Sequence, residues 1–400
     1  MFECPNDLIY GGRLFVNESA YTDQPMKTAL ILSGGGARAA YQAGVLKALM
    51  EIYPREDFPF DIVCGTSAGA INAVFLAAHA DQPRSGVDKL TRAWRGLRPR
   101  DVYQVGWWDV LKRVFNVLRG PFSSDGRGAP ASLLDNTPLR HLLLGWLDFD
   151  AVRRNIEAHH LESISVTAMD YADGNSIAFF ESSGDYNWAR LYRRGRHTRL
   201  AVEHVMASAA IPILFPAERI ESAHFGDGAL RQLHPISPAL KFGAERLFVI
   251  GVSAREKRLA HQIERRRPTI GQMAGHLLNR EFIDNLEADI ELARRFNRFS
   301  DALTDAQRDE LEIHPIETFV LTPSIHFGEI AADYMSEQPA ALKLFFRLLG
   351  ASQRGAGASF ASYLMFDGAY CERLMACGYA DACADRERIE SFFTPHESNE

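Results

Sequence analysis

Ser67 is the residue whose surroundings most clearly suggest chemistry. It is the central residue of Gly65-Thr66-Ser67-Ala68-Gly69, where glycines two positions to either side leave room for a tight backbone turn. A serine hydroxyl on such a turn can attack a carbonyl carbon if a base takes its proton and N–H donors stabilise the oxyanion. The pattern therefore indicates acyl transfer, with Gly65 and Gly69 shaping the turn of the nucleophile.

A run of three glycines upstream could supply the oxyanion donors. Gly34-Gly35-Gly36 lies on an expected loop between a strand and a helix. Without β-carbons the chain adopts unusual dihedrals and approaches other groups closely, so several N–H groups can point toward one place. Each donor of this kind contributes roughly 3 to 4 kcal/mol to transition-state stabilisation.

Asp227 is the candidate base. It lies between Gly226 and Gly228 in a sharp turn far downstream of the serine. Asp-Gly is also an ordinary turn signal, so this residue by itself leaves a structural interpretation open. A carboxylate with a pKa of about 4 is a weak base at pH 7, so a base at this position must be partly desolvated.

The elements that must position these residues alternate between strand and helix. Short apolar runs at 29–32 and 60–64 predict buried strands, and residues 39–50 and 70–78 have the spacing of helices. This order predicts an α/β fold with a parallel sheet covered by helices on both faces. Ser67 then lies at a helix N-terminus, where the helix dipole favours developing negative charge.

The rest of the chain predicts three regions: an N-terminal arm at 1–26, a catalytic domain at 27–253, and a mostly helical C-terminal extension at 254–400. In the extension, a strand near 318–322 is expected to return to the core. Further expected elements are helices at 137–146, 149–158, 200–210, 270–299 and within 329–391, hairpin strands at 163–169 and 176–180, and a strand at 247–252.

Composition narrows the classes of function. A formal net charge of -7 over 400 residues argues against a dedicated nucleic-acid binder. The start of the sequence lacks the basic and apolar segments of a signal peptide, and no apolar stretch is long enough to span a membrane. Five scattered cysteines predict reduced thiols and a cytoplasmic location. Cys371, Cys377 and Cys383 lack the spacing of zinc ligands, so no metal site is expected.

Two segments raise contact with a membrane surface as a hypothesis. Residues 107–118 carry an apolar stripe from Trp107 to Leu118, with Lys112 and Arg113 off its centre, which is compatible with a surface helix, a lid or a helix packed on the core. Residues 190–199 contain five arginines, which could form a solvated face or contact phosphate headgroups.

Taken together, the three motifs resemble the patatin-like phospholipase family. The likeness rests on Gly34-Gly35-Gly36-Ala37-Arg38, the serine turn, Asp227-Gly228-Ala229 and the segment 206–216, and covers roughly residues 27–253. It implies a parallel α/β hydrolase core and hydrolysis of acyl esters in phospholipids or similar lipids, without metal or cofactor. By resemblance Ser67 is the nucleophile, Asp227 the base of a dyad, and Gly34, Gly35 and Gly36 the oxyanion hole, with Arg38 as a further candidate. The aspartate is followed by Gly-Ala where Gly-Gly is commoner.

Three alternatives stay open. An α/β-hydrolase triad would need a histidine, for which His224, His234, His261 and His314 are candidates. The glycine run also fits a dinucleotide fingerprint, although Asp61 lies at the start of the second strand and not at its end. A non-catalytic protein with the same fold is the third.

Overall fold

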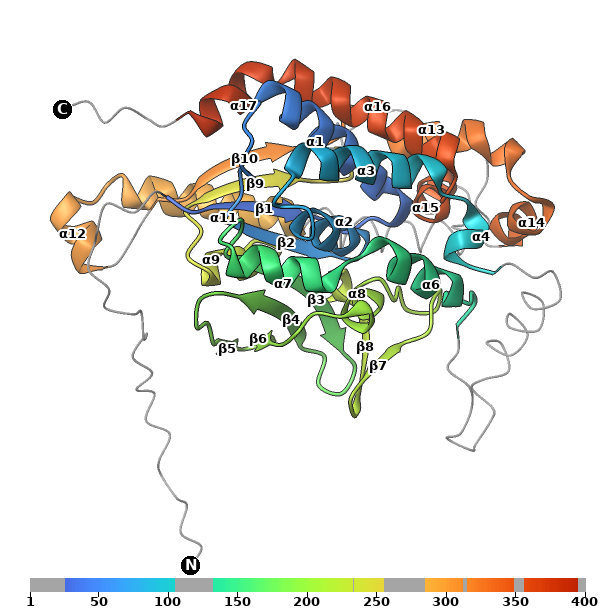
Figure 1. The fold of residues 1–400 in the computed structure, drawn as a ribbon, viewed down its shortest axis with the longest axis horizontal. Coiled ribbons are helices and arrows are strands. Elements are labelled where there is room, and N and C mark those ends of the chain that lie inside the picture. Colours follow the sequence, from blue (N-terminus) through green and yellow to red (C-terminus); the bar gives the residue numbers. More distant parts are fainter. Residues whose placement is uncertain are drawn as a thin grey trace, which may run out of the picture.

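The structure of the chain is a computed structural model, and it describes residues 26–104, 132–232, 234–254, 285–311, 315–348 and 356–394. The predicted N-terminal arm up to residue 25, the 107–118 segment and the first half of the predicted helix at 270–299 lie outside these residues. Within them, one sheet of ten strands runs through the centre and helices are layered against it (Figure 1).

The sheet is mixed and mostly parallel. Its main path has the strand order β10-β9-β1-β2-β3-β4-β6-β5. The continuous parallel run at one end of this path consists of β1 (Thr28–Leu32), β2 (Ile62–Thr66), β3 (Ser163–Asp170), β9 (Arg246–Ile250) and β10 (Glu317–Leu321). The others are β4 (Ser176–Ser182), β5 (Ala189–Arg190), β6 (Arg193–His197), β7 (Glu218–Ile220) and β8 (Ala223–Asp227). Both β4 and β8 run antiparallel to β3, and the β3–β4 pair confirms the hairpin predicted from residues 163–169 and 176–180.

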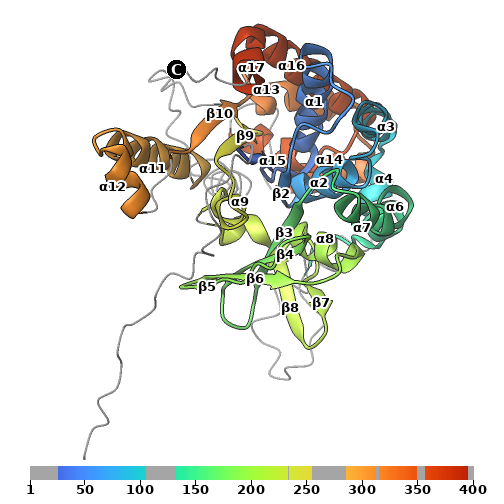
Figure 2. The ribbon, with the colours of Figure 1, turned by 60° about the vertical axis from the view of Figure 1, so that its left-hand side comes forward.

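Helices cover both faces of the sheet, which confirms the predicted fold class. Side chains alternate between faces along each strand, so Leu30 and Leu32 of β1 face one core while Ala29 and Ile31 face the other. The first core is built with α1 (Ala40–Ile52), α2 (Ala68–Ala77), α3 (Pro83–Gly96), α4 (Pro99–Val102), α6 (Thr137–Trp146), α7 (Phe149–Glu157) and α8 (Val202–Ser208). The second is built with α9 (Ser237–Lys241) and α11 (Asn285–Ser300), on the opposite side of the sheet from α1 in Figure 2.

The C-terminal helices belong to the first core. They are α13 (Phe327–Tyr334), α14 (Ala340–Leu348), α15 (Ala356–Leu364), α16 (Gly368–Ala384) and α17 (Arg386–Phe393), and a short α12 (Asp305–Glu310) precedes them. Helices α1 and α16 pack so closely that a β-carbon on Gly44 would lie 1.9 Å from the carbonyl oxygen of Met375. Residues on both sides of the expected boundary at 253 therefore share one core.

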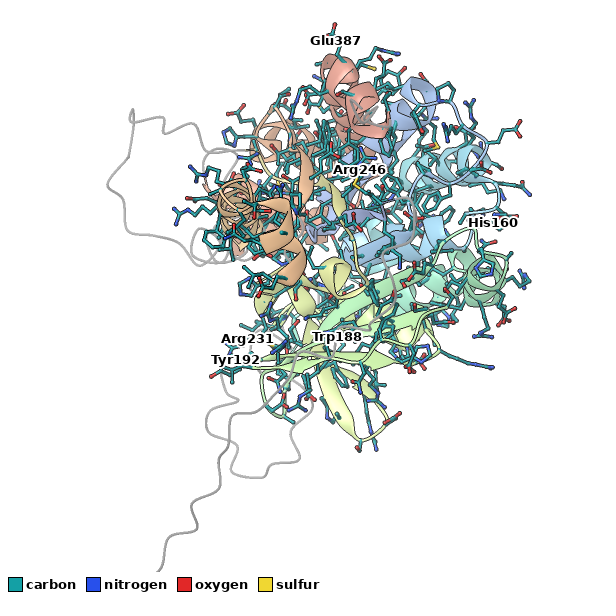
Figure 3. All side chains as sticks on the ribbon, turned by 90° about the vertical axis from the view of Figure 1, so that its left-hand side faces the viewer. His160, Trp188, Tyr192, Arg231, Arg246 and Glu387 are labelled. Carbon is teal, nitrogen blue, oxygen red and sulfur yellow. The ribbon has the colours of Figure 1, made fainter. Side chains whose placement is uncertain are left out.

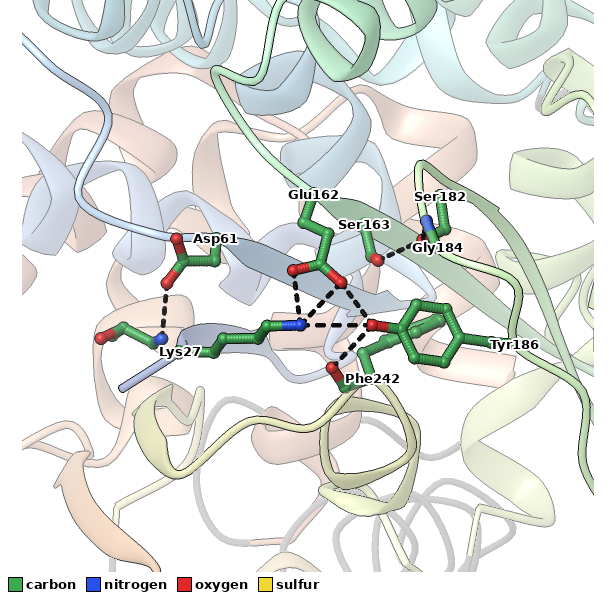
Figure 4. Close-up of polar contacts among 9 residues, drawn as sticks. Lys27, Asp61, Glu162, Ser163, Ser182, Gly184, Tyr186 and Phe242 are labelled. Carbon is green, nitrogen blue, oxygen red and sulfur yellow. Dashed lines mark hydrogen bonds and ion pairs between the residues drawn. The ribbon is translucent and has the colours of Figure 1, made fainter. Parts of the chain in front are cut away.

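Charged residues directly before the parallel strands all have polar partners at the amino end of the sheet (Figure 4). Asp61 precedes β2 and accepts the N–H of Thr28 at 2.7 Å. Lys27 precedes β1 and forms an ion pair with Glu162, which precedes β3, at 2.8 Å. The hydroxyl of Tyr186 also donates to Glu162. These side chains already have protein partners. The candidate active site lies at the opposite end of the sheet, where β1 and β2 have their carboxyl ends.

Among the helices described here, none is both long enough and apolar enough to cross a bilayer.

Candidate active site

The turn at Ser67 joins the end of β2 to the start of α2. Ser67 has φ 55° and ψ −130°, a left-handed conformation that is strained for a residue with a side chain. A β-carbon on Gly65 would lie 2.6 Å from the Cα of Ala70, and one on Gly69 would lie 2.3 Å from the carbonyl oxygen of Leu32. Close approach of the backbone therefore requires both glycines, and the second also brings the turn against the end of β1.

The structure brings Ser67 and Asp227 into direct contact. The Oγ of Ser67 donates a hydrogen bond to Oδ2 of Asp227 at 2.6 Å, although the two residues are 160 positions apart. Asp227 ends β8, whose pairing with β3 sets it opposite Ala168. Its Oδ1 accepts the main-chain N–H of Ala229 at 2.9 Å. Ser67 is 2% exposed and Asp227 is 1% exposed, so the pair is shielded from water.

Burial also changes the acidity of this carboxyl group. Desolvation raises the pKa of Asp227 to about 7, while the hydrogen bonds from Ser67 and Ala229 act in the opposite direction. A group with a pKa near the working pH exchanges a proton with a neighbouring hydroxyl more effectively than a carboxylate of ordinary acidity. A base at this position was expected to be partly desolvated, and Asp227 is indeed buried.

The glycine loop after β1 passes beside the serine turn. The β-carbon that Gly69 lacks would also lie 2.6 Å from the carbonyl oxygen of Ser33, one residue before the loop. In the described part of the chain, no protein group accepts the N–H of Gly34, Gly35 or Gly36. Three such donors on a loop that begins beside the serine turn are compatible with an oxyanion site.

Two of these glycines are required by contacts behind the loop. Gly36 has φ 56°, and a β-carbon there would lie 2.1 Å from the carbonyl oxygen of Tyr363 in α15. A β-carbon on Gly35 would lie 2.3 Å from Cγ2 of Val252, just after β9. The loop is therefore held between the end of β9 and the C-terminal helix α15.

Arg38 is directed away from the glycine loop and toward the C-terminal helices. Its guanidinium donates to the hydroxyls of Ser362 at 2.7 Å, Ser253 at 2.8 Å and Ser359 at 2.8 Å, and lies over the ring of Tyr363 at 3.7 Å from its centre. Its main-chain N–H donates to the carbonyl oxygen of Gly35 at 3.1 Å. These contacts favour a role in positioning the loop over a role as an oxyanion donor.

The order of these motifs along the chain can be compared with known proteins. A family profile described as patatin-like phospholipase matches residues 30–240, which includes the glycine loop, the serine turn and the aspartate. The chain belongs to the patatin-like phospholipase family. Helices α13 to α17, of which α15 packs behind the glycine loop, lie beyond the matched segment.

The individual proteins that match share a modest sequence identity or only a short segment with this chain. A cGAMP-activated phospholipase of Pseudomonas aeruginosa is 27% identical over 212 residues, which are 52% of this chain and 54% of that protein. A patatin-like phospholipase domain-containing protein of Pyricularia oryzae is 45% identical over 94 residues, 23% of this chain and 11% of that one. The chain thus matches about half the length of the bacterial relative and a small part of the fungal one.

Among solved structures, a human GIVD cytosolic phospholipase A2 in complex with methyl gamma-linolenyl fluorophosphonate aligns at 14% identity and a TM-score of 0.44, over 92% of this chain and 58% of that one.

Ser208 is a site residue of this patatin-like phospholipase that the sequence reasoning did not single out. Its hydroxyl accepts the main-chain N–H of Ser67 at 2.8 Å and donates to the carbonyl oxygen of Thr167 at 2.6 Å. Ser208 is fully buried on α8. Its position within the 206–216 segment, noted only as part of the family resemblance, was the one available signal.

A series of buried side-chain hydrogen bonds leads from α3 to the residue before the glycine loop, and the sequence did not reveal it. Trp94 donates through Nε1 to Asn72 at 2.9 Å, Asn72 donates to Gln42 at 2.9 Å, and Gln42 donates to the carbonyl oxygen of Ser33 at 2.8 Å. The four residues come from α3, α2, α1 and the start of the loop. No local pattern reveals such a network, because its members are far apart in the sequence.

The histidines proposed for a triad have other surroundings. His224 is exposed on β8. The Nδ1 of His234 lies 2.5 Å from a carboxylate oxygen of buried Asp289 on α11. His261 and His314 lie outside the described residues. In the described part of the chain, no histidine hydrogen-bonds to the serine and aspartate of the site.

The dinucleotide alternative required an acidic side chain at the carboxyl end of the second strand. Thr66 and Ser67 occupy that end, and Thr66 donates to Gln232 at 2.6 Å. Asp61 lies at the other end of β2, bound to Thr28. The ribose ligand that a dinucleotide fold needs is therefore missing from the expected position.

Proposed function

We propose that this patatin-like phospholipase hydrolyses acyl ester bonds of lipids, in the manner of a phospholipase A or lysophospholipase, with Ser67 as nucleophile and Asp227 as base. The observation that carries the proposal is the 2.6 Å hydrogen bond from Ser67 Oγ to Asp227 Oδ2 within a buried site. A serine hydroxyl on a strained turn, aimed at a carboxylate whose pKa burial has raised, has the parts of an activated nucleophile.

In the first half of the reaction, Asp227 accepts the proton as Ser67 Oγ attacks the ester carbonyl carbon. The negative charge on the carbonyl oxygen is stabilised by N–H groups of Gly34, Gly35 and Gly36. Collapse of the tetrahedral intermediate breaks the ester C–O bond. The leaving alkoxide takes the proton from Asp227, which leaves an acyl group on Ser67.

In the second half, Asp227 accepts a proton from water, and the hydroxide equivalent attacks the acyl carbon. The second tetrahedral intermediate collapses, Ser67 regains its proton from Asp227, and a fatty acid is released. A single carboxyl group serves as acid and base in turn, for which a pKa near 7 is suitable.

The lipid substrate class rests on family membership. The family profile is that of patatin-like phospholipases, and the Pseudomonas aeruginosa relative is itself described as a phospholipase. The buried position of the serine adds a physical argument, since water-excluded sites suit an apolar acyl chain better than a charged substrate.

Labelling with a fluorophosphonate tests the nucleophile. The probe reacts by forming a bond between phosphorus and an activated serine oxygen with loss of fluoride, so the wild-type chain should be labelled and Ser67→Ala should not. Ser183→Ala removes an exposed hydroxyl from another part of the fold and is the matched control. Equal labelling of wild type and Ser67→Ala would contradict the proposal.

Release of fatty acid from phospholipid and lysophospholipid micelles tests the base. We expect Asp227→Asn to abolish hydrolysis, while His224→Ala and His234→Ala retain it. The opposite result, with activity kept in Asp227→Asn and lost in either histidine variant, would replace the dyad by a triad.

A further inference from the structure

A group of exposed apolar and basic side chains lies at the turn between β5 and β6. Leu191 is 78% exposed and Tyr192 is 46% exposed. Tyr192 has φ 64°, an unfavourable conformation for a residue with a side chain, so the turn is held in place by its surroundings. Arg190 and Arg193 flank these two residues. We call Tyr171, Arg190, Leu191, Tyr192, Arg193 and Arg231 the edge patch.

The sheet register places the edge patch at the same end of the sheet as the candidate active site. Arg193 of β6 lies opposite Ser176 of β4, Ser176 lies opposite Met169 of β3, and Met169 lies opposite Gly226 of β8. Gly226 directly precedes Asp227. Three strand spacings correspond to roughly 15 Å, so the patch is close to the dyad.

Direct contacts also connect the edge patch to the segment around Asp227. The guanidinium of Arg231, four residues after Asp227, lies 4.9 Å from the ring centre of Tyr192, and the two are labelled together at one corner of Figure 3. Arg231 also donates to the carbonyl oxygen of Gly174 in the β3–β4 turn at 3.0 Å. Tyr171, 44% exposed, lies so close to Gly226 that a β-carbon there would be 2.5 Å from its hydroxyl.

The basic residues of the edge patch are incompletely neutralised. Arg194 beside the patch is paired with Asp173 at 3.4 Å. In the part of the chain that the structure describes, neither Arg190 nor Arg193 has a carboxylate within ion-pair distance, and the only acidic group whose pKa Arg193 affects there is the buried Asp289. Both lie near Lys241, whose pKa is lowered first by burial and then by these two positive charges. On a chain with a net charge of -7, this is a local excess of positive charge.

We propose that the edge patch docks the protein on an anionic bilayer surface. Arginines bind phosphate headgroups, while leucine and tyrosine side chains insert among the headgroups with an apolar body and, for tyrosine, a polar tip. The proposal rests on the proposed function, since a lipid hydrolase needs its site presented to a membrane. An acidic protein surface could pair with the arginines, but it offers no apolar environment into which the exposed side chain of Leu191 could insert.

Vesicle flotation with the full chain tests the patch directly. The chain carries Ser67→Ala so that lipid is not consumed, and vesicles contain phosphatidylcholine with or without phosphatidylglycerol. We expect binding only to anionic vesicles. Arg190→Gln/Arg193→Gln should weaken it by about fivefold for each arginine, hence roughly 25-fold. Leu191→Ser/Tyr192→Ser should weaken it at least about tenfold, including at high salt, because insertion of apolar side chains is not screened.

Matched controls remove similar side chains elsewhere. Arg84→Gln/Arg92→Gln takes two exposed arginines from α3, and Leu144→Ser takes a leucine that is 57% exposed on α6. The controls should bind as the parent does, and the melting temperature of every variant reports folding. An equal loss in patch and control variants would overturn the proposal. So would complete competition by inorganic phosphate, which would indicate an anion site in place of a membrane surface.

The two proposals fail in distinguishable ways. A chain that is labelled at Ser67 by fluorophosphonate but floats with no vesicle would remove the docking surface and leave the hydrolase proposal intact. A chain that floats through the edge patch but is not labelled would remove the hydrolase and leave the docking surface.

Discussion

The main-chain N–H of Ser67 donates to the hydroxyl of Ser208 at 2.8 Å, and that hydroxyl donates to the carbonyl oxygen of Thr167 at 2.6 Å. The strained turn is thereby tied to α8 and β3. Because this N–H is occupied, it is not free to stabilise an oxyanion, which agrees with the proposal that the glycine loop supplies the donors. Ser208 therefore fixes the main-chain position of the proposed nucleophile.

Replacing Ser208 by alanine should lower both activity and stability. The change leaves the buried N–H of Ser67 without a partner, which costs about 1 to 3 kcal/mol in the free energy of unfolding. A displaced nucleophile should lower kcat by about tenfold to a hundredfold. Ser165→Ala is the control, since the buried hydroxyl of Ser165 on β3 has no oxygen or nitrogen partner among the described residues. Equal effects of the two substitutions on kcat would contradict the positioning role.

The rate of ester hydrolysis should depend on the ionisation of Asp227. The carboxylate is the active form, and burial raises its pKa to about 7. We expect kcat/KM for a soluble ester to fall about tenfold for each pH unit below that value and to level off above it. A profile that stays flat down to pH 5 would show that a group of lower pKa limits the rate.

The same carboxyl group should make the protein less stable at neutral pH than at acidic pH. The folded chain holds a proton on Asp227 that the unfolded chain releases with a pKa of about 4, so this contribution to the free energy of unfolding falls as pH rises from about 4 to 7 and is constant above. Asp227→Asn removes the buried charge, so its melting temperature should exceed that of the wild type at pH 8. The difference should shrink at pH 5, and scanning calorimetry at both pH values measures it. A variant that melts below the wild type at pH 8 would argue against a desolvated carboxylate.

Arg38→Lys should damage the site through the C-terminal helix. Lysine keeps the charge but cannot reproduce the fork that binds Ser253, Ser359 and Ser362. We expect a loss of about 2 to 4 kcal/mol in the free energy of unfolding and a lower kcat with little change in KM. Arg95→Lys is the control, because Arg95 also reaches a C-terminal helix, at Glu372, but through an exposed ion pair worth less than about 1 kcal/mol. If kcat is unchanged in Arg38→Lys, the contacts of Arg38 with α15 do not control the geometry of the glycine loop.

Gly36→Ala should displace the glycine loop. The added β-carbon would meet the carbonyl oxygen of Tyr363, and φ of 56° adds about 1 to 2 kcal/mol of strain. Labelling of Ser67 by fluorophosphonate should slow markedly, because the donors move while the nucleophile stays. Gly145→Ala on α6, where the β-carbon meets nothing within 4 Å, should leave labelling unchanged and raise stability by up to about 1 kcal/mol. Normal labelling of Gly36→Ala would mean that the loop does not supply the oxyanion donors.

Local patterns in the sequence determined the elements and the chemistry that they carry. Apolar runs predicted β1 and β2, and the glycines around Ser67 predicted a strained turn, because tight backbone geometry restricts residue type within a few positions. The order of the three motifs also indicated the family. The antiparallel pairing of β3 with β4 was predicted as a hairpin, but that of β8 with β3 was not, since this pairing depends on contacts between segments far apart in the sequence.

Tertiary structure decided which residues work together. Nothing near Asp227 in the sequence shows that its carboxyl is buried and bound to a serine 160 positions away, and its raised pKa follows from that burial. Arg38 looked like a member of the glycine loop, yet its guanidinium binds α15, more than 300 residues later. Ser208 became a site residue only when α8 packed beneath the turn. Burial and hydrogen-bond partners arise from long-range packing, which a linear sequence encodes but does not display.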